Sequence, residues 1–155
     1  MSRGRALLLG GVTVGVLDLL DAFVFFGRRG ITPVQILHSI ASGLLGRAAW
    51  RGGAPTAILG GLLHFFIAFS IVAIYHAASR RMPDLARRPW LWGPLYGAVA
   101  YVVMTWVVVP LSAAPFPPPH DPHQIANGLL IHLLGVGLPA ALSARAAQPA
   151  AIASR

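Results

Sequence analysis

The chain contains no cysteine and no lysine, and few of its residues carry a charge. The lack of cysteine excludes disulfides, thiolate catalysis, iron–sulfur clusters and zinc sites built from thiolates. Only 10% of the 155 residues are charged, 56% are hydrophobic, and the mean hydropathy is +0.70. These values exclude an ordinary soluble domain. The net charge of +8 comes from arginine alone, which hints at the codon usage of a GC-rich bacterial genome.

Four stretches are long and apolar enough to cross a bilayer as helices. They cover about residues 6–27, 55–78, 90–111 and 124–144. The hydrocarbon core of a bilayer is about 30 Å thick, and about 20 apolar residues in helical form cross it. The spans and their loops nearly fill the chain, so we expect one membrane-embedded domain over residues 1–155. The first stretch imitates a signal peptide, but no small-x-small site precedes Arg28-Arg29, so we expect an uncleaved span.

The segment between the first two spans has the pattern of an amphipathic helix over about residues 33–50. Thr32 suits the N-cap, Pro33 suits the first helical position, and Gln35 supports the helix start. About 17 residues at 1.5 Å each give about 25 Å, which is short for a span. We therefore predict an all-α polytopic membrane protein with four transmembrane helices. One further helix, amphipathic or re-entrant, is expected between the first and second spans.

The arginines predict which side of the membrane each loop occupies. If residues 33–50 do not span, one side holds eight arginines and the other holds four. The eight are Arg3, Arg5, Arg80, Arg81, Arg87, Arg88, Arg145 and Arg155. The positive-inside rule then places both termini in the cytoplasm and the chain in a bacterial inner membrane. The proline-rich loop at residues 113–123 is expected to face the periplasm.

The basic pairs Arg80-Arg81 and Arg87-Arg88 lie in a short loop beside apolar spans. They suit anionic lipid headgroups, although retention of topology alone also explains them. We expect the bilayer and its anionic lipids as partners and no nucleic acid, because no soluble basic surface is present. Four spans are few for a transport pathway, so such a pathway is expected in a homo-oligomer. Gly11 and Gly15 offer a packing surface for a second copy.

Polar residues fall at one depth in all four spans. Asp18, His64 and His132 each lie eight or nine residues from the outer end of their span. At 1.5 Å per residue this depth is about 12–14 Å. The same layer holds Asp21, Tyr101 and Thr105, and we predict that all six residues form one cluster. Asn127 lies about 140° from His132 around the fourth span, at 100° per residue, and is expected to make a different contact.

Three interpretations of this cluster stay open. It is structural if its hydrogen bonds only fix the register of the helices. It is a protonation or ion pathway if its ionisable groups act, as such groups inside a membrane often do. It is a haem site if His64 and His132 bracket an iron, although the glycine- and alanine-rich helix faces around them do not indicate a space large enough for a porphyrin.

From the sequence we expect neither an enzyme nor a bound metal or cofactor. No nucleophile elbow, phosphate loop or zinc-protease motif is present. The run His120-Asp121-Pro122-His123 has metal-binding residue types, but proline-rich loops often carry incidental histidine. The sequence thus predicts a small bacterial inner-membrane protein of unassigned activity with a candidate polar site in its outer half. The alternatives are a proton-coupled carrier or channel component, a haem-binding electron carrier, and a structural membrane assembly subunit.

About half of the chain, from Leu63 to Leu142, resembles the YagU-like bacterial inner-membrane proteins. The resemblance rests on order and spacing, in His64–Ile71, a basic loop with Pro83, Trp92–Ala98, Val109–Leu111 before a proline-rich loop, and the late His132. It implies an inner-membrane protein linked to acid tolerance, with no established transport substrate. It does not cover Asp18 or Asp21.

Overall fold

The computed structural model describes residues 1–148, so Arg155, which enters the arginine count, lies outside the described residues. Within residues 1–148 the chain is helical and has no strand. Its long helices are α1 (Arg3–Gly27), α3 (Gly53–Arg81), α5 (Pro89–Val103) continued by α6 (Val109–Leu111), and α7 (Pro122–Ile131) continued by α8 (Leu138–Ala146). All four are long and apolar enough to cross a membrane, as the sequence predicts.

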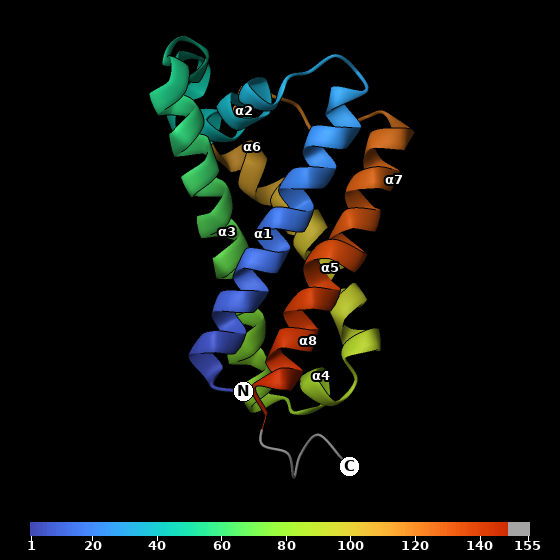
Figure 1. The fold of residues 1–155 in the computed structure, drawn as a ribbon. Coiled ribbons are helices and arrows are strands. Elements are labelled where there is room, and N and C mark those ends of the chain that lie inside the picture. Colours follow the sequence, from blue (N-terminus) through green and yellow to red (C-terminus); the bar gives the residue numbers. More distant parts are fainter. Residues whose placement is uncertain (149–155) are drawn as a thin grey trace.

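The four spanning helices run in alternating directions, so both described ends of the chain lie at one end of the bundle (Figure 1). There the amino group of Met1 donates a hydrogen bond to the carbonyl oxygen of Ala146 at 3.2 Å. The short helix α4 (Asp84–Arg87) joins α3 to α5 at this same end. We call it the inner end and the opposite one the outer end. The described part of the chain therefore has an even number of helices long enough to cross a membrane, as the arginine count requires.

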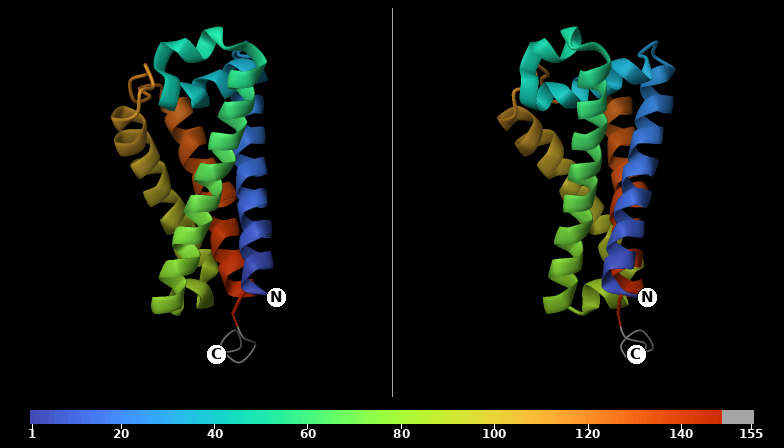
Figure 2. Two further views of the ribbon diagram at one scale, coloured as in Figure 1. Left: turned by 90° about the vertical axis from the view of Figure 1, so that its left-hand side faces the viewer. Right: turned by 60° about the vertical axis from the view of Figure 1, so that its left-hand side comes forward.

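A shorter helix, α2 (Pro33–Leu45), crosses the outer end of the bundle (Figures 1 and 2). Thr32 and Gln35 form the capping box that starts it, because each side chain accepts a hydrogen bond from the backbone N–H of the other. The helix ends earlier than expected and passes into a 3-10 segment, Gly46–Arg51. Gly46 has a φ of 56°, a left-handed conformation that favours glycine, and it stops α2 there.

Contacts with α3 hold α2 in place. The Nε2–H of His38 donates to the carbonyl oxygen of Gly53 at 2.9 Å. A side chain at Gly60 would meet the backbone carbonyl of Leu37, so the two helices approach closely only because Gly60 has none. Leu44, in contrast, is 62% exposed. The helix thus turns apolar surface outward.

Small residues on α1 let α3 approach along its length. A side chain at Gly11 would meet the ring of Phe69, and one at Gly15 would meet the ring of Phe65. Both glycines are buried inside the chain. The small-residue face expected on α1 therefore exists, but the expectation that Gly11 and Gly15 face a second copy is wrong. Their surface is already covered by α3.

The inner half of the bundle contains the hydrophobic core. Eight buried residues from α1, α3, α8 and the turn before α8 make it, namely Val14, Ala68, Val72, Tyr75, Val136, Ala140, Ala141 and Ala144. Backbone meets backbone where α5 packs against the fourth span, since a side chain at Gly137 would meet the carbonyl oxygen of Gly93 and the backbone of Gly97. Such contacts between small residues are typical of membrane helices.

Two prolines widen the helices that flank the outer half. Pro110 and Pro139 have no N–H, and a proline ring clashes with the carbonyl four residues earlier in a regular helix. In both cases the preceding turn is π-helical, at Met104–Val108 and at His132–Gly137. Figure 2 shows α5–α6 leaning away from α1 and α3 toward the outer end. Wide turns of this kind are frequent at functional sites.

Candidate functional site

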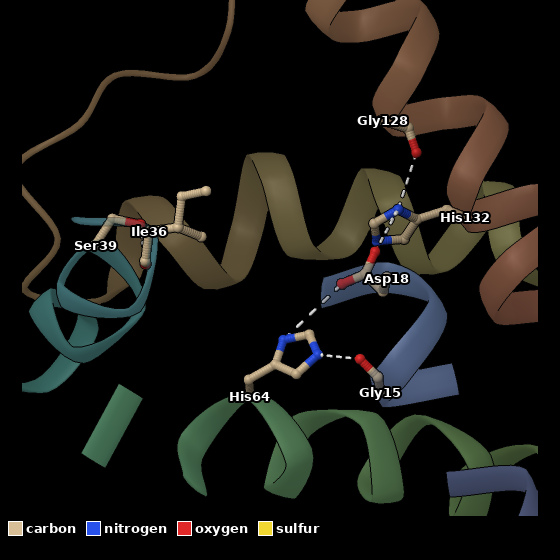
Figure 3. Close-up of polar contacts among 7 residues, drawn as sticks. All are labelled: Gly15, Asp18, Ile36, Ser39, His64, Gly128 and His132. Carbon is tan, nitrogen blue, oxygen red and sulfur yellow. Dashed lines mark hydrogen bonds and ion pairs between the residues drawn. The ribbon is translucent and has the colours of Figure 1, made fainter. Parts of the chain in front are cut away.

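Asp18 on α1 lies between two histidines from two other spans (Figure 3). Its Oδ2 atom is 4.0 Å from Nδ1 of His64 on α3, and its Oδ1 atom is 3.9 Å from Nδ1 of His132 on the fourth span. These distances fall within ion-pair range and are longer than a direct hydrogen bond. The side chains are 29%, 11% and 16% exposed, so water screens them only in part. Equal depth in the sequence thus corresponds to proximity in the structure.

A backbone contact fixes the tautomer of His64. Its Nε2 atom lies 2.8 Å from the carbonyl oxygen of Gly15, and because a carbonyl only accepts, Nε2 carries the hydrogen. In a neutral ring Nδ1 then has a lone pair, and this lone pair faces the carboxylate of Asp18. Two acceptors that face each other repel. One proton held on Nδ1 or on the carboxyl group turns this repulsion into attraction.

His132 presents the opposite character to the same carboxylate. Its Nδ1–H donates to the carbonyl oxygen of Gly128, one turn earlier on the same helix, at 2.9 Å. The atom that faces Asp18 is therefore a donor even when the ring is neutral. The ring of Tyr101 on α5 packs edge-on against the imidazole, with centroids 5.2 Å apart. The two histidines are consequently not equivalent, since a neutral His64 turns an acceptor toward Asp18 and His132 turns a donor toward it.

The second acid, Asp21, has a partner that the sequence did not predict. The Nδ2–H of Asn127 donates to Oδ2 of Asp21 at 2.7 Å. Asn127 thus makes a different contact from His132, as expected, but this contact lies in the same polar layer because α1 and α7 are antiparallel. One turn beyond the pair of Asp18 and His132, the next acid on α1 meets the next polar residue on α7. That antiparallel register is the signal from which Asn127 could have been found.

Tyr101 is buried, with 7% exposure, and among residues 1–148 its hydroxyl has no hydrogen-bond partner. Buried hydroxyls without a partner are uncommon in folded proteins. A side chain at Gly128 would collide with the Tyr101 ring, so the glycine leaves the space that the ring fills. Thr105 lies one turn further out, in the π-helical turn of its span. Both side chains, as the sequence suggests, belong to the layer of Asp18 and His132.

A cavity of about 850 Å³ opens at the outer end above this layer. Its lining includes the polar side chains of this layer, beside apolar residues such as Ile131. The polar ones are Asp18, Asp21, Tyr101, Thr105, Asn127 and His132. Its mouth lies beside α2 and the proline-rich loop, where Trp50, Phe116 and residues 117–120 line it. His64 does not line it and contacts Asp18 from α3. The volume is in the range of about 300–1,000 Å³ that is usual for small-molecule sites.

Charge is distributed unevenly around this cavity. Two of the four acids in the chain line it, and none of the arginines in residues 1–148 does. At its edge Arg29 stacks 4.2 Å over the ring of Phe25 and donates to Oδ2 of Asp121 at 2.7 Å. Asp121 also accepts from the backbone N–H of His123, and this bond together with Arg29 holds the pKa of Asp121 below its ordinary value. Arg29 is therefore already paired with Asp121, and no arginine of residues 1–148 lies in the cavity beside Asp18 and Asp21.

The geometry fits the haem interpretation poorly. Asp18 lies within 4.0 Å of both imidazoles, in the space that an iron porphyrin between them would need. Among the described residues, no group of three or more His, Asp or Glu side chains has the spacing of a metal site. In the proline-rich loop, Asp121 pairs with Arg29 and caps α7. The polar layer is therefore better described as a set of hydrogen-bonding and ionisable groups.

The predicted headgroup arginines, Arg80, Arg81, Arg87 and Arg88, lie at the inner end, in the last turn of α3 and around α4. Arg87 forms an ion pair with Asp84 at 3.5 Å. They lie at the end of the bundle opposite the cavity and do not line it. Their contact with lipid stays a prediction.

No family model, curated protein or solved structure matches this chain. The resemblance to YagU-like proteins, and the link to acid tolerance that it implies, therefore gain no support. Function has to be argued from the polar layer and the cavity above it.

Proposed function

We propose that this chain is a bacterial inner-membrane protein that binds protons at Asp18 and acts as a component of a proton-coupled carrier. The observation that carries the proposal is the lone pair of His64 Nδ1 facing the Asp18 carboxylate at 4.0 Å, beside a cavity. A purely structural contact has no need for two facing acceptors. Ionisable groups inside a membrane are costly, and chains of Asp and His are typical of proton relays.

The groups around Asp18 suggest an order for proton uptake. Asp18 and His132 line the cavity and His64 does not, so a proton from the outer end reaches the first two before His64. On Asp18 the proton makes the carboxyl group a donor toward Nδ1 of His64. Asp21 on the same helix repels a second negative charge, and Tyr101 of α5 packs against His132. Binding one proton therefore relieves repulsion on both sides of Asp18.

The packing of the two halves favours a carrier over a channel. None of the eight core residues of the inner half lines the cavity. The cavity thus reaches one end of the bundle while the other end is packed, as expected for a carrier open to one side. A channel needs a continuous path across both halves.

The positive-inside rule supports an orientation with the outer end toward the periplasm. In this orientation α2 lies at the periplasmic surface of the membrane, with Leu44 and Leu45, both exposed, toward lipid. Arg80-Arg81 and Arg87-Arg88 then lie at the cytoplasmic surface, where anionic headgroups are expected.

A structural assembly subunit is the second candidate, and specific bonds favour it. His64 joins α3 to α1 through the Gly15 carbonyl, and Asn127 joins α7 to α1 through Asp21. Hydrogen bonds between membrane helices contribute about 0.6 kcal/mol on average, so a single isosteric change should not unfold the bundle. Substitution of Asp18 can therefore separate the two candidates.

The decisive experiment compares Asp18→Asn with Asp84→Asn, an acid with a side-chain exposure of 71% at the inner end. Infrared difference spectra between neutral and acidic pH report carboxyl protonation, and proteoliposomes with a trapped pH dye report proton uptake. We expect Asp18→Asn to lose a buried carboxyl band and the pH-dependent uptake, and Asp84→Asn to keep both. Unchanged spectra and uptake in folded Asp18→Asn would reject proton binding and leave the structural candidate.

Orientation has its own test, because the chain has no cysteine of its own. Pro118→Cys places a thiol in the outer loop, and Arg88→Cys places one at the inner end. We expect a membrane-impermeant maleimide to label Pro118→Cys on whole cells and Arg88→Cys only after lysis. The reverse pattern would invert the proposed orientation.

A further inference from the structure

We propose that the outer cavity binds a protonated amine with an apolar body, which makes an amphipathic organic cation the ligand of this site. The inference rests on the proposed function, because it names the ligand whose binding the proton at Asp18 would control. Charge and an aromatic wall point to this class of molecule, and an unpaired hydroxyl offers it a hydrogen bond.

The acidic residues of the cavity indicate the charge of the ligand. Asp18 and Asp21 line the cavity, and the arginines of residues 1–148 are absent from its lining. Asn127 donates one hydrogen bond to Oδ2 of Asp21, and a neutral amide adds no positive charge. Acidic groups that lose water need a partner charge. A cation supplies it, while an anion would meet two carboxylates.

The hydroxyl of Tyr101 gives the hydrogen-bonding requirement. The side chain of Thr105 lies beside it, but the pair lacks the distance and angle of a hydrogen bond, although Tyr101 is 93% buried and lines the cavity. A buried hydroxyl without a partner is unfavourable, and an N–H group can donate to its oxygen. A primary, secondary or tertiary ammonium provides such a donor. A quaternary ammonium or an alkali metal ion does not.

The aromatic wall gives the body of the ligand. Phe25, Phe26, Trp50 and Phe116 line the same cavity as the two acids. Aromatic faces attract cations within about 6 Å, and Arg29 over Phe25 at 4.2 Å already shows this contact at the edge of the site. A volume of about 850 Å³ is far too large for an inorganic ion alone. The site therefore suits an ammonium group with an apolar or aromatic portion.

Amine and proton then compete for the same negative charge. An ammonium beside Asp21 and Asp18 takes the place of the proton that Asp18 and His64 share, so binding of one molecule releases one proton. This competition requires no covalent step. It connects the polar layer to the cavity as parts of one exchange site.

The test uses three probes with similar apolar bodies and different charge, namely 2-phenylethylammonium, 2-phenylethanol and 3-phenylpropionate. Their binding to the purified full chain is measured by isothermal titration calorimetry at neutral pH. We expect the ammonium to bind, the alcohol to bind at least about tenfold more weakly, a difference of about 1.4 kcal/mol, and the carboxylate not to bind. Equal binding of all three would overturn the proposal, because apolar contact alone would then explain it.

Two substitutions locate the site. Asp21→Asn should weaken ammonium binding at least about tenfold, and Tyr101→Phe about threefold, as expected for loss of a charge contact and of one hydrogen bond. Asp21→Asn keeps an oxygen that can accept from Asn127, and Tyr101→Phe removes a group with no partner, so both should fold. Asp84→Asn at the inner end is the matched control and should bind like the wild type. Wild-type affinity in both Asp21→Asn and Tyr101→Phe would overturn the proposal.

Proton uptake without any amine separates this inference from the proposed function. If uptake depends on Asp18 but the ammonium does not bind, the assignment of the ligand is wrong and proton binding stands. If the ammonium binds at Asp21 but uptake is the same in Asp18→Asn, the cavity is an amine site and proton coupling is wrong.

Discussion

The inner and outer halves of the bundle differ in how completely their central polar side chains are paired. In the inner half, the hydroxyls of Tyr75 and Tyr96 donate to backbone carbonyls at 2.8 and 2.7 Å, and His76 contacts Ser143 at 2.9 Å. In the outer half, Asp18 faces two histidines at about 4 Å, and within residues 1–148 the hydroxyl of Tyr101 has no partner. Paired groups fix a structure, whereas groups without partners remain available to a proton or a ligand.

The packing differs in the same direction. The inner half contains the core cluster and the contact of Gly137 with Gly93 and Gly97, where backbone meets backbone. The outer half contains a cavity of about 850 Å³ below α2. Among the described residues of the inner half, the indole N–H of Trp92 on α5 departs from the pattern of paired polar groups, because it is buried without a hydrogen-bond partner. The comparison suggests that stability comes mainly from the inner half and that activity belongs to the outer half.

The largest expected effect comes from adding one methyl group to the inner half. In Gly137→Ala the new Cβ would meet the Gly93 carbonyl and the backbone of Gly97, which cannot move without separating the helices. Overpacking usually costs about 1–3 kcal/mol, and a clash with backbone should reach or exceed the upper figure. We expect little folded protein by size-exclusion chromatography in mild detergent.

The matched control is Gly27→Ala at the outer end of α1, where nothing lies within 4 Å of the new Cβ. It should fold like the wild type. Normal folding of Gly137→Ala would show that the inner half is less tightly packed than the comparison holds.

The second largest expected effect is a difference in how easily water reaches the two halves. Ser39 lines the cavity, while Ser79 in the inner half is 3% exposed. Because the chain has no cysteine, Ser39→Cys and Ser79→Cys each introduce a single thiol of nearly unchanged size. We expect a water-soluble maleimide to label Ser39→Cys quickly in the folded protein. Ser79→Cys should react only as fast as the bundle opens locally. Similar rates would contradict the comparison.

The sequence predicts correctly the features that depend on a single helix. Length and apolarity were sufficient to find all four spans, because a bilayer of fixed thickness requires both. The constant rise of 1.5 Å per residue was sufficient to place Asp18, His64 and His132 at one level. The start of α2 was equally clear, since Thr32 and Gln35 cap it through local bonds alone.

Contacts and cavities that depend on how two or more helices pack could not be predicted from single segments. The partner of Asp21 is set by the antiparallel register of α1 and α7, which brings Asn127 to it. The cavity exists because α2 lies across the outer end and α5–α6 leans outward, and no single segment indicates either. The glycines of α1 indicate a close helix contact but not which helix makes it, so the sequence alone does not distinguish a second copy from α3, which packs there.

Removal of tyrosine hydroxyls should give smaller effects with different signs in the two halves. Tyr75→Phe and Tyr96→Phe each leave a buried carbonyl without its donor, and about 0.6–1.5 kcal/mol of unfolding free energy should be lost. Tyr101→Phe removes a hydroxyl that has no partner within residues 1–148, so its stability should be unchanged or slightly higher. Unfolding in mixed micelles of rising SDS fraction measures all three. A loss in Tyr101→Phe equal to that in Tyr96→Phe would show that the Tyr101 hydroxyl is bonded.

The smallest expected effect concerns the exposed ion pair of Arg29 and Asp121 at the edge of the cavity. Folding lowers the pKa of Asp121 below its ordinary value of 3.8, through the His123 N–H and Arg29. The pair therefore stabilises the folded chain at pH values above 3.8, and this contribution is lost as the pH falls through the lowered pKa. Asp121→Asn removes the charge but keeps an N-cap for α7, because asparagine caps helices as well as aspartate does.

Asp121→Asn should accordingly be slightly less stable than the wild type at neutral pH, and the difference should vanish in acid and at high salt. Thermal unfolding of both proteins across the pH range, with Arg29→Gln and the double variant, measures the pair by a double-mutant cycle. A difference that grows toward acid pH would mean that the carboxyl group of Asp121 is stabilised in its neutral form. The edge of the cavity would then bind protons as the polar layer is proposed to do, and the contrast between a paired edge and a proton-binding interior would fail.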